Sequence, residues 1–159
     1  MSFLLDSNIF IEAKNTFYAF DICPGFWTWL SQCDETKSVT MVKQELLAGA
    51  DELTEWVKEH LPEDFFITEN EEIQEAYRTV ANHVHSLPEF QAPAKLRFLS
   101  GADGWLIAAA ILRRDVIVTH EQNDHKCRRK ILLPVIAAHF GLHCQKIYDV
   151  LRTLQVQFH

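Results

Sequence analysis

Four acidic side chains stand where secondary-structure elements are expected to begin or end: Asp6, Glu45, Asp103 and Glu121. Asp6 and Glu121 each follow a short apolar run, and Asp103 precedes the apolar residues 105–112. Carboxylates that lie close together raise one another's pKa unless a cation lies between them. Oxygen-only ligands of this kind suit Mg²⁺ or Mn²⁺, which can activate water for attack on a phosphodiester. Together the four acids predict a divalent-metal site that serves hydrolysis.

Each acid also has a simpler interpretation when it is taken alone. Asp6 is a good residue for capping a helix, and Asp103 would place a favourable negative charge at a helix N-terminus. Glu45 could lie on an exposed helix face, and Glu121 in a loop. Only the joint pattern favours the metal site.

The elements that must position these acids alternate along the chain. Strands are expected at residues 2–5, 38–41, 65–67, 116–118 and near 143–147. Helices are expected at residues 9–14, 25–34, 42–48, 51–60, 69–85, 105–112, 134–140 and 148–154. This alternation predicts an α/β fold, with a mostly parallel central sheet covered by helices on both faces. In such a sheet the carboxyl ends of the strands are where ligands bind.

Composition limits the class of protein. The chain of 159 residues is expected to form a single domain over residues 1–159. Its net charge of −7 argues against a protein that coats nucleic acid through bulk electrostatics. We expect no secretory signal, because Asp6 interrupts the first apolar run, and no membrane span, because no apolar run reaches about 18 residues. The four cysteines form no C-x-x-C motif, which favours reduced thiols and a cytoplasmic protein.

The pattern of acids and strands resembles the PIN-domain nucleases. The matching segments are LLDSNIFIEA with Asp6, Ser7 and Asn8, VKQEL with Glu45, GADGWLIAAAIL with Asp103, and VIVTHE with Thr119 and Glu121. The resemblance implies a PIN-like three-layer fold and a metal-dependent endoribonuclease that uses Mg²⁺ or Mn²⁺. Many members are toxins of bacterial toxin–antitoxin pairs, so it also implies an RNA substrate, a cognate antitoxin and, as a further expectation, a homodimer.

The resemblance assigns roles to individual residues. Asp6, Glu45, Asp103 and Glu121 would ligate the metal, while Ser7, Asn8 and Thr119 would orient carboxylates, water or a substrate phosphate. Two features depart from the family pattern. The last acid is Glu121 where Asp is usual, and Asp124 could substitute for it. An aromatic insert at about residues 15–33, which contains most of the segment KNTFYAFDICPGFWTWL, makes the chain longer than the compact toxins.

Two further groups of residues each allow more than one interpretation. The basic residues Lys126, Arg128, Arg129 and Lys130 could contact RNA phosphates beside the metal, or form a solvated loop. The aromatic residues 17–29 could fill the core, stack on bases, or receive an apolar helix from a partner.

Other functions remain as alternatives. Histidine and cysteine gather in residues 120–144, but no zinc-binding spacing is present among them. A PIN-like binding or scaffold module with little or no catalysis is the alternative from another class. A DNA or structure-specific nuclease is the third, because the metal chemistry alone does not distinguish the sugars.

Overall fold

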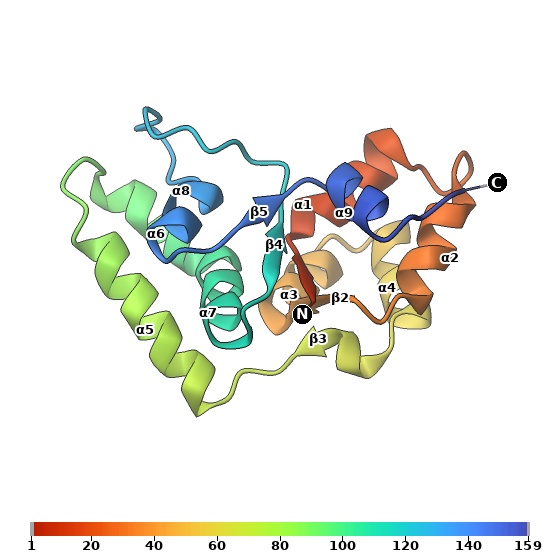
Figure 1. Ribbon diagram of the computed structural model, residues 1–159, viewed down its shortest axis with the longest axis horizontal. Coiled ribbons are helices and arrows are strands. Elements are labelled where there is room, and N and C mark those ends of the chain that lie inside the picture. Colours follow the sequence, from red (N-terminus) through yellow and green to blue (C-terminus); the bar gives the residue numbers. More distant parts are fainter. Residues whose placement is uncertain (1, 159) are drawn as a thin grey trace.

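The structure is a computed structural model that describes residues 2–158 (Figure 1). Within that range the strands are β1 (Phe3–Leu5), β2 (Thr36–Val39), β3 (Phe66–Ile67), β4 (Val116–Val118) and β5 (Cys144–Gln145). The α-helices are α1 (Ser7–Glu12), α2 (Pro24–Gln32), α3 (Thr40–Ala48), α4 (Glu52–His60), α5 (Glu71–His85), α6 (Ala92–Ser100), α7 (Asp103–Arg113), α8 (Leu133–His139) and α9 (Ile147–Thr153). Two short turns of other helix types are η1 (Ala13–Phe17) and η2 (Glu63–Phe65).

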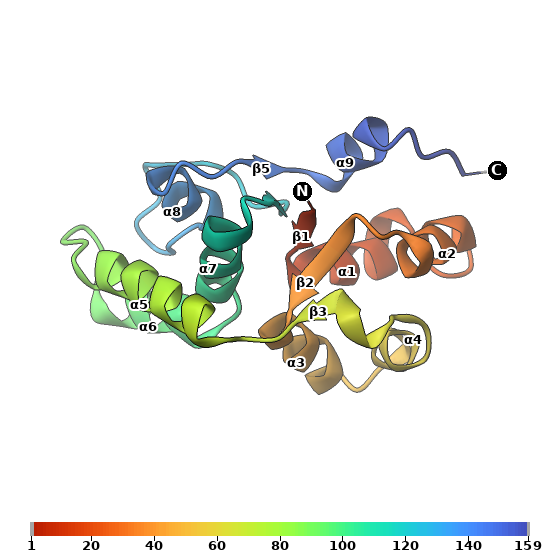
Figure 2. The same ribbon diagram turned by 60° about the horizontal axis from the view of Figure 1, so that its bottom comes forward.

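The sheet has the strand order β3-β2-β1-β4-β5, and every neighbouring pair within residues 2–158 is parallel. Figure 2 shows α1 to α4 on one side of the sheet and α5 to α8 on the other. The predicted three-layer α/β fold with a parallel sheet is therefore confirmed.

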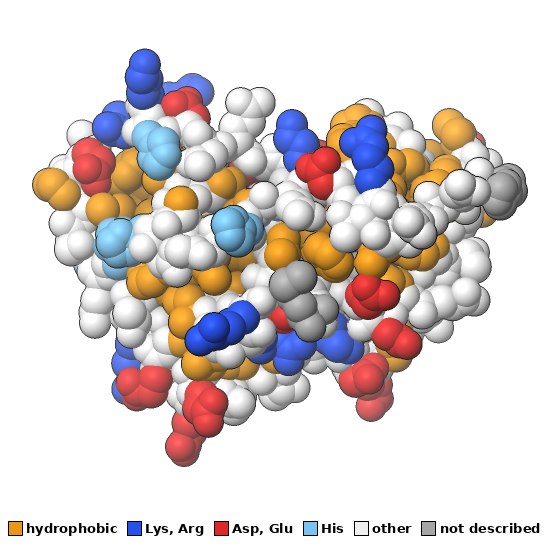
Figure 3. Space-filling model, viewed as in Figure 1, with side chains coloured by type: hydrophobic (Ala, Val, Ile, Leu, Met, Phe, Trp, Pro, Cys, Tyr) orange, Lys and Arg blue, Asp and Glu red, His pale blue; other side chains and the backbone are white. Residues whose placement is uncertain are grey.

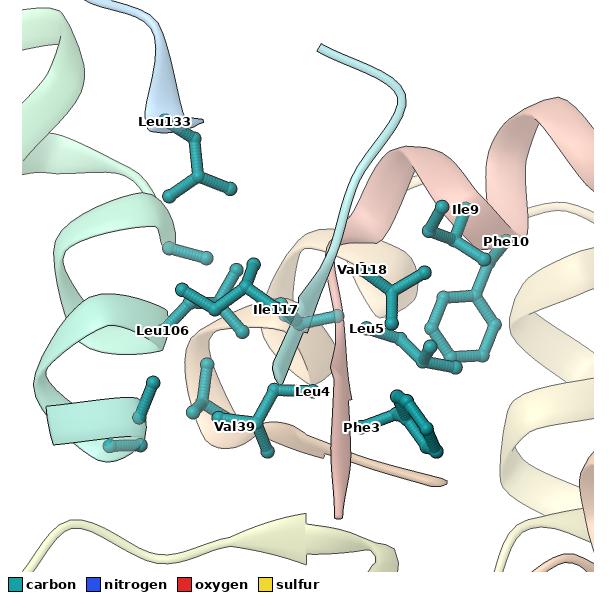
Figure 4. Packing of buried hydrophobic residues seen from close by; sticks show 14 of the residues in the cluster. Phe3, Leu4, Leu5, Ile9, Phe10, Val39, Leu106, Ile117, Val118 and Leu133 are labelled. Carbon is teal, nitrogen blue, oxygen red and sulfur yellow. The ribbon is translucent and has the colours of Figure 1, made fainter. Parts of the chain in front are cut away.

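The core lies on both faces of the central strand β1 and of its neighbour β4 (Figure 4). Successive strand residues point to opposite faces. Phe3 and Leu5 face α1, while Leu4 between them faces α7. Burial on both faces explains why these strands are continuous apolar runs rather than alternating ones.

Helix α7 is buried over most of its circumference, as its apolar sequence predicts. It packs against α5 and also contacts α6, α8, β2 and β4. Arg114 ends it in the left-handed conformation at φ 58°. The buried Asp115 follows and accepts hydrogen bonds from Arg113 Nε at 2.7 Å and from the Ser2 amide at 2.7 Å. These bonds fix the start of β4 beside the start of β1.

Several boundaries differ from the sequence-based expectation. β2 and α3 both begin two residues earlier than expected, at Thr36 and Thr40. Residues 15–17, expected as a connection, belong instead to a π-helical turn at Ala13–Phe17. This turn continues α1 and is closed by a hydrogen bond from the Tyr18 amide to the Ala13 carbonyl. Within residues 2–158, no helix combines the length and apolarity that crossing a membrane requires.

Most aromatic residues of the insert pack against one another and against Trp56 of α4. Phe26 and Trp27 are buried, and each stacks on a neighbour from the preceding loop: Phe26 on Tyr18 and Trp27 on Phe20. Core packing is therefore the main role of the insert. Phe17 is an exception, since 46% of its surface is exposed.

Candidate metal centre

The site begins where β1 and β4 end side by side. Leu5 pairs with Val118, so Asp6 and Thr119 are the next residues in register. The Thr119 hydroxyl donates to Asp6 Oδ2 at 3.0 Å, and both side chains are buried. Asp6 holds the N-cap position of α1, yet among the described residues its side chain makes no capping hydrogen bond there. The capping interpretation of Asp6 therefore does not account for its carboxylate.

Asp103 and Glu45 reach the same edge from two helices. Asp103 is the first residue of α7, and Glu45 lies on α3, which follows β2. Glu45 Oε1 accepts a hydrogen bond from the Ala102 amide at 3.0 Å, immediately before Asp103. Gly101, one residue earlier, lies beside the same carboxylate, since a Cβ atom there would be in ordinary van der Waals contact with Glu45 Oε1 at 3.4 Å. Glu45 is exposed, as its simpler interpretation expects, but its carboxylate contacts the start of α7.

The acids are close enough to perturb one another. The pKa of Asp103 is raised to about 8 by burial and then by the charges of Asp6, Glu121 and Glu45. The pKa of Asp6 is raised to about 6 by burial and by Glu121 and Glu45, although the Thr119 hydrogen bond opposes this rise. Two acids with pKa values near neutrality are what crowded, desolvated carboxylates without a cation produce.

Glu121 is held by the chain that follows it. Its Oε1 accepts from Lys130 Nζ at 2.8 Å, and its Oε2 accepts from the Leu133 amide at the start of α8 at 2.7 Å. Hydrogen bonding to Glu121 in turn raises the pKa of Lys130. Lys130 therefore places one positive charge next to the acids.

The donor chemistry of the site fits a hard divalent cation, because its candidate ligands are carboxylate oxygens. In the present arrangement Asp6, Glu45 and Glu121 each accept hydrogen bonds from the protein. Over residues 2–158, no three His, Cys, Asp or Glu side chains converge as a preformed ligand group. A cation would thus be held only after these side chains turn toward it.

The other residues expected to support the site lie at different distances from it. Ser7 is buried, and its hydroxyl lies 3.5 Å from Asp6 Oδ1, while Asn8 is exposed on α1. Asp124 is exposed, and its Oδ1 accepts a hydrogen bond from the Lys126 amide in the same loop. The structure thus places Ser7 against Asp6 and gives Asp124 a contact within its own loop.

The basic residues divide between the site and the loop. Lys130 binds Glu121, whereas Arg128 donates to the carbonyls of His125 and Cys127 and lies over the Phe90 ring. Lys126, Arg128 and Arg129 are exposed. Lys and Arg side chains gather over this loop at the upper left of Figure 3.

The histidines considered for zinc binding are separated in the fold. His139 stacks on His83 with ring centroids 3.6 Å apart, while His120 lies between Phe17 and Tyr148. The stacked pair lies on the α5–α8 side of the sheet, and His120 follows β4. His120 and His139 thus each have aromatic neighbours of their own.

Sequence reasoning missed residues that follow the last strand. A cleft of about 1030 Å³ adjoins Glu121 and is lined by Gln145, Lys146, Tyr148 and Arg152, among others. Part of this position could have been predicted, since the rule that ligands bind at the carboxyl ends of strands also applies to β5. The position was concealed because the strand is short and no acid comes directly after it.

A sequence family described as "Domain of unknown function (DUF4411)" matches residues 3–158. The chain belongs to this family. Among curated proteins, none matches this DUF4411 domain by sequence.

The fold of the DUF4411 domain is similar to that of a protein of known structure. The crystal structure of VapBC2 from Rickettsia felis, bound to a DNA fragment from their promoter, contains a chain that aligns with a TM-score of 0.55 and 14% sequence identity. The alignment covers 92% of the DUF4411 domain and 98% of that chain. At this identity the likeness concerns the fold, and it confirms the predicted PIN-like architecture.

Proposed function

We propose that this DUF4411 domain is a metal-dependent endoribonuclease that hydrolyses RNA phosphodiester bonds. The observation that carries the proposal is the cluster of four acids, which two strand ends and two helices bring to one edge of the sheet. Buried carboxylates that raise one another's pKa are costly to stability. Such a cost is typical of a functional site rather than of a structural one.

In the proposed enzyme Asp6, Glu45, Asp103 and Glu121 would hold Mg²⁺ or Mn²⁺. A bound cation would lower the pKa of a water molecule and neutralise charge that builds up on the phosphate. Thr119 holds the Asp6 carboxylate in place through its hydroxyl. Lys130, already beside Glu121, is positioned to contact a phosphate oxygen once the carboxylate turns toward a cation.

The test is RNA cleavage by purified protein in Mg²⁺, in Mn²⁺ and in EDTA. We expect RNA cleavage that requires the cation. Asp6→Asn or Asp103→Asn should reduce the cleavage rate by about two or more orders of magnitude, which is the effect of losing one essential electrostatic group. Asp34→Asn, which removes one exposed carboxylate just before β2, at the edge of the sheet opposite the cluster, is the matched control. Cleavage of DNA of the same sequence, compared with cleavage of the RNA, tests whether the enzyme distinguishes ribose from deoxyribose. Full activity of a folded Asp103→Asn protein would contradict the proposal.

We also propose that the enzyme is the toxin of a toxin–antitoxin pair. The similar chain from Rickettsia felis comes from a VapBC2 complex, which supports this role at the level of the fold. Expression of the wild type should arrest growth and leave mapped RNA ends, whereas Asp103→Asn should do neither. Coexpression of the cognate antitoxin should restore growth. Equal toxicity of the Asp103→Asn protein would instead favour a binding module.

The binding-module alternative rests on Glu121. Both oxygens of its carboxylate already have partners in Lys130 and the Leu133 amide, so the residue is structurally satisfied without a cation. If this is its whole role, cations will leave the protein's melting temperature unchanged and RNA will be bound without being cleaved.

A further inference from the structure

Two histidines far apart in the sequence stack face to face where α5 and α8 end. His83 lies in the last turn of α5 and His139 is the last residue of α8, and the two helices lie on the same side of the sheet (Figure 2). The ring centroids are 3.6 Å apart, and the ring planes differ by only 10°. The Phe140 ring lies edge-on to the stack, 5.6 Å from His83 and 4.9 Å from His139. We call His83 and His139 the histidine pair.

The histidine pair forms part of the wall of a pocket of about 440 Å³. Apolar walls of this pocket come from Leu87 and Phe90, which follow α5, and from Val135 and Ile136 on α8. Because the pocket separates these walls, the stacked rings supply a contact between the two helices that apolar side chains do not make across the pocket.

Side chains of both charges surround the histidine pair. Those that line the pocket are Glu89 after α5 and, in the loop before α8, Asp124, His125, Cys127, Arg128 and Lys130. The ion pairs that histidines form with carboxylates within residues 2–158 are those of His60 and His120. A proton on the histidine pair therefore has no carboxylate in direct contact with it.

A proton on either ring is subject to opposing effects. Burial lowers the pKa of His83, and the neighbouring His139 lowers it further, while the charge of Glu89 acts in the opposite direction. Both rings lie at helix C-termini, where the helix dipole favours a positive charge. One proton in the pair is thus tolerated, but two positive rings 3.6 Å apart repel each other.

The helix that the histidine pair contacts also holds Glu121. α8 begins at Leu133, whose amide donates to Glu121 Oε2 at 2.7 Å. The other oxygen, Oε1, accepts from Lys130 Nζ, and Lys130 lines the pocket beside the histidine pair. A movement of α8 away from α5 would therefore weaken the bond between the Leu133 amide and Glu121.

We propose that the histidine pair is a pH-sensitive contact, which holds α8 against α5 while at least one ring is neutral and releases α8 when both rings bind a proton in mild acid. Release would free one oxygen of the Glu121 carboxylate from the Leu133 amide. The contact and its pH dependence do not depend on the proposed ribonuclease function. Only the effect of a freed Glu121 on catalysis rests on that function.

The direction of the effect on stability follows from proton binding. The ordinary pKa of histidine is 6.5, and that of His83 in the folded protein is lower. Between these values the unfolded chain binds more protons, so this contribution to stability is present above about pH 6.5 and is lost as the pH falls through the lower, folded pKa. Asp6 and Asp103 act in the opposite direction, because their pKa values are raised. The test therefore compares the wild type with variants that keep both acids.

The first measurement is an NMR titration of the histidine rings from pH 8 to pH 5 in EDTA. In the wild type we expect His83 to titrate below pH 6.5. His139→Phe keeps a ring against His83 that cannot carry a charge, so the midpoint of His83 should rise by about 0.5 pH unit or more. His85→Gln removes an exposed histidine from the end of the same helix and is the control, which should leave the midpoint of His83 unchanged.

The second measurement is amide hydrogen exchange along α8 at pH 7.5 and pH 5.5, corrected for intrinsic exchange rates. In the wild type, protection of the Leu133 amide should fall about threefold or more at the lower pH, which corresponds to a shift of about half a pKa unit. In His139→Phe the fall should be smaller, whereas His85→Gln should behave as the wild type does. All three proteins keep the acids, so the effect of the acids cancels in the comparison.

Wild-type rings that both titrate at pH 6.5 would overturn the inference without the use of any variant. The same conclusion would follow if His139→Phe matched the wild type both in the midpoint of His83 and in the protection of Leu133, because the two rings would then titrate independently. Neither measurement involves RNA or a metal ion. The ribonuclease proposal and this inference therefore fail separately.

Discussion

Asp103 is subject to opposing electrostatic effects. As the first residue of α7 its carboxylate is favoured by the helix dipole, an effect of about 0.3–1 kcal/mol. Burial and the charges of Asp6, Glu121 and Glu45 act in the other direction and raise its pKa to about 8. Because each pKa unit corresponds to about 1.4 kcal/mol, the unfavourable effects exceed the dipole. A cation among the acids would remove that imbalance.

This imbalance predicts a pH dependence of stability. The folded pKa of Asp103, about 8, lies above its ordinary value of 3.8, so between these values the folded state binds more protons than the unfolded state. The stability of the metal-free protein should therefore fall as pH rises from about 4 to about 8. Asp103→Asn removes this effect and should melt higher than the wild type at pH 8 by about 2 °C or more.

The measurement is thermal unfolding in EDTA at pH 5 and at pH 8, with Asp34→Asn as the control for the loss of one exposed charge. The rise in melting temperature that Asp103→Asn causes should be smaller at pH 5, where the wild-type carboxyl is protonated. A gain of the same size at both pH values would show that charge repulsion is not its cause.

At the residue scale, the sequence predicted the side-chain positions that depend on strand register. It predicted few of the contacts that depend on the path of a loop. Asp6 and Thr119 meet because both follow buried strands that pair in parallel, and apolar runs reveal such strands. The contacts of Glu121 with Lys130 and the Leu133 amide depend on how residues 122–132 fold back. No periodic pattern encodes the path of such a loop.

At the scale of elements, α7 is the helix around which the site is built. It carries Asp103 at its first position and packs against α5 along its length. Gly104 permits this packing, since a Cβ atom there would lie 2.9 Å from Tyr77 Cε2. Tyr77 itself cannot move freely, because it stacks on Trp105 at 4.0 Å and its hydroxyl donates to the Leu99 carbonyl at 2.8 Å.

We therefore expect Gly104→Ala to destabilise the protein by about 1–3 kcal/mol through overpacking, although alanine favours helix formation. Gly49→Ala is the matched control, because a Cβ atom at Gly49, in helical conformation at φ −66°, would make only ordinary contacts of 3.5 Å or more. Chemical denaturation gives both free energies of unfolding. Equal stability of the two variants would contradict the packing of α5 on α7.

Most helices and strands could be predicted from the sequence, and those that could not have physical causes. An apolar stretch with no polar face predicts a buried helix, and α7 is one. The π-turn at residues 13–17 was not predictable, because AKNTF has no apolar period. Its geometry accompanies the docking of the following aromatic residues, Tyr18 and Phe20, against α2, which is a tertiary effect.

At the scale of the whole molecule, alternation of strands and helices predicted the layers but not the strand order. The order β3-β2-β1-β4-β5 puts β1 in the centre, with β2 and β4 on either side. Asp6 therefore lies between the contributions of α3 and of the loop after β4. This central place explains why one buried acid is affected by charges from both neighbouring elements.

The most direct test of the account follows Mn²⁺ binding and RNA cleavage in the same samples, with free Mn²⁺ measured by electron paramagnetic resonance. We predict saturable Mn²⁺ binding and cleavage by the wild type, and the loss of both in Asp103→Asn. Asp124→Asn should retain both, since Asp124 is exposed and bound to its own loop, and Glu121→Gln should lose them. Unchanged Mn²⁺ binding and cleavage by a folded Asp103→Asn protein would contradict the assignment of the four acids as a metal centre.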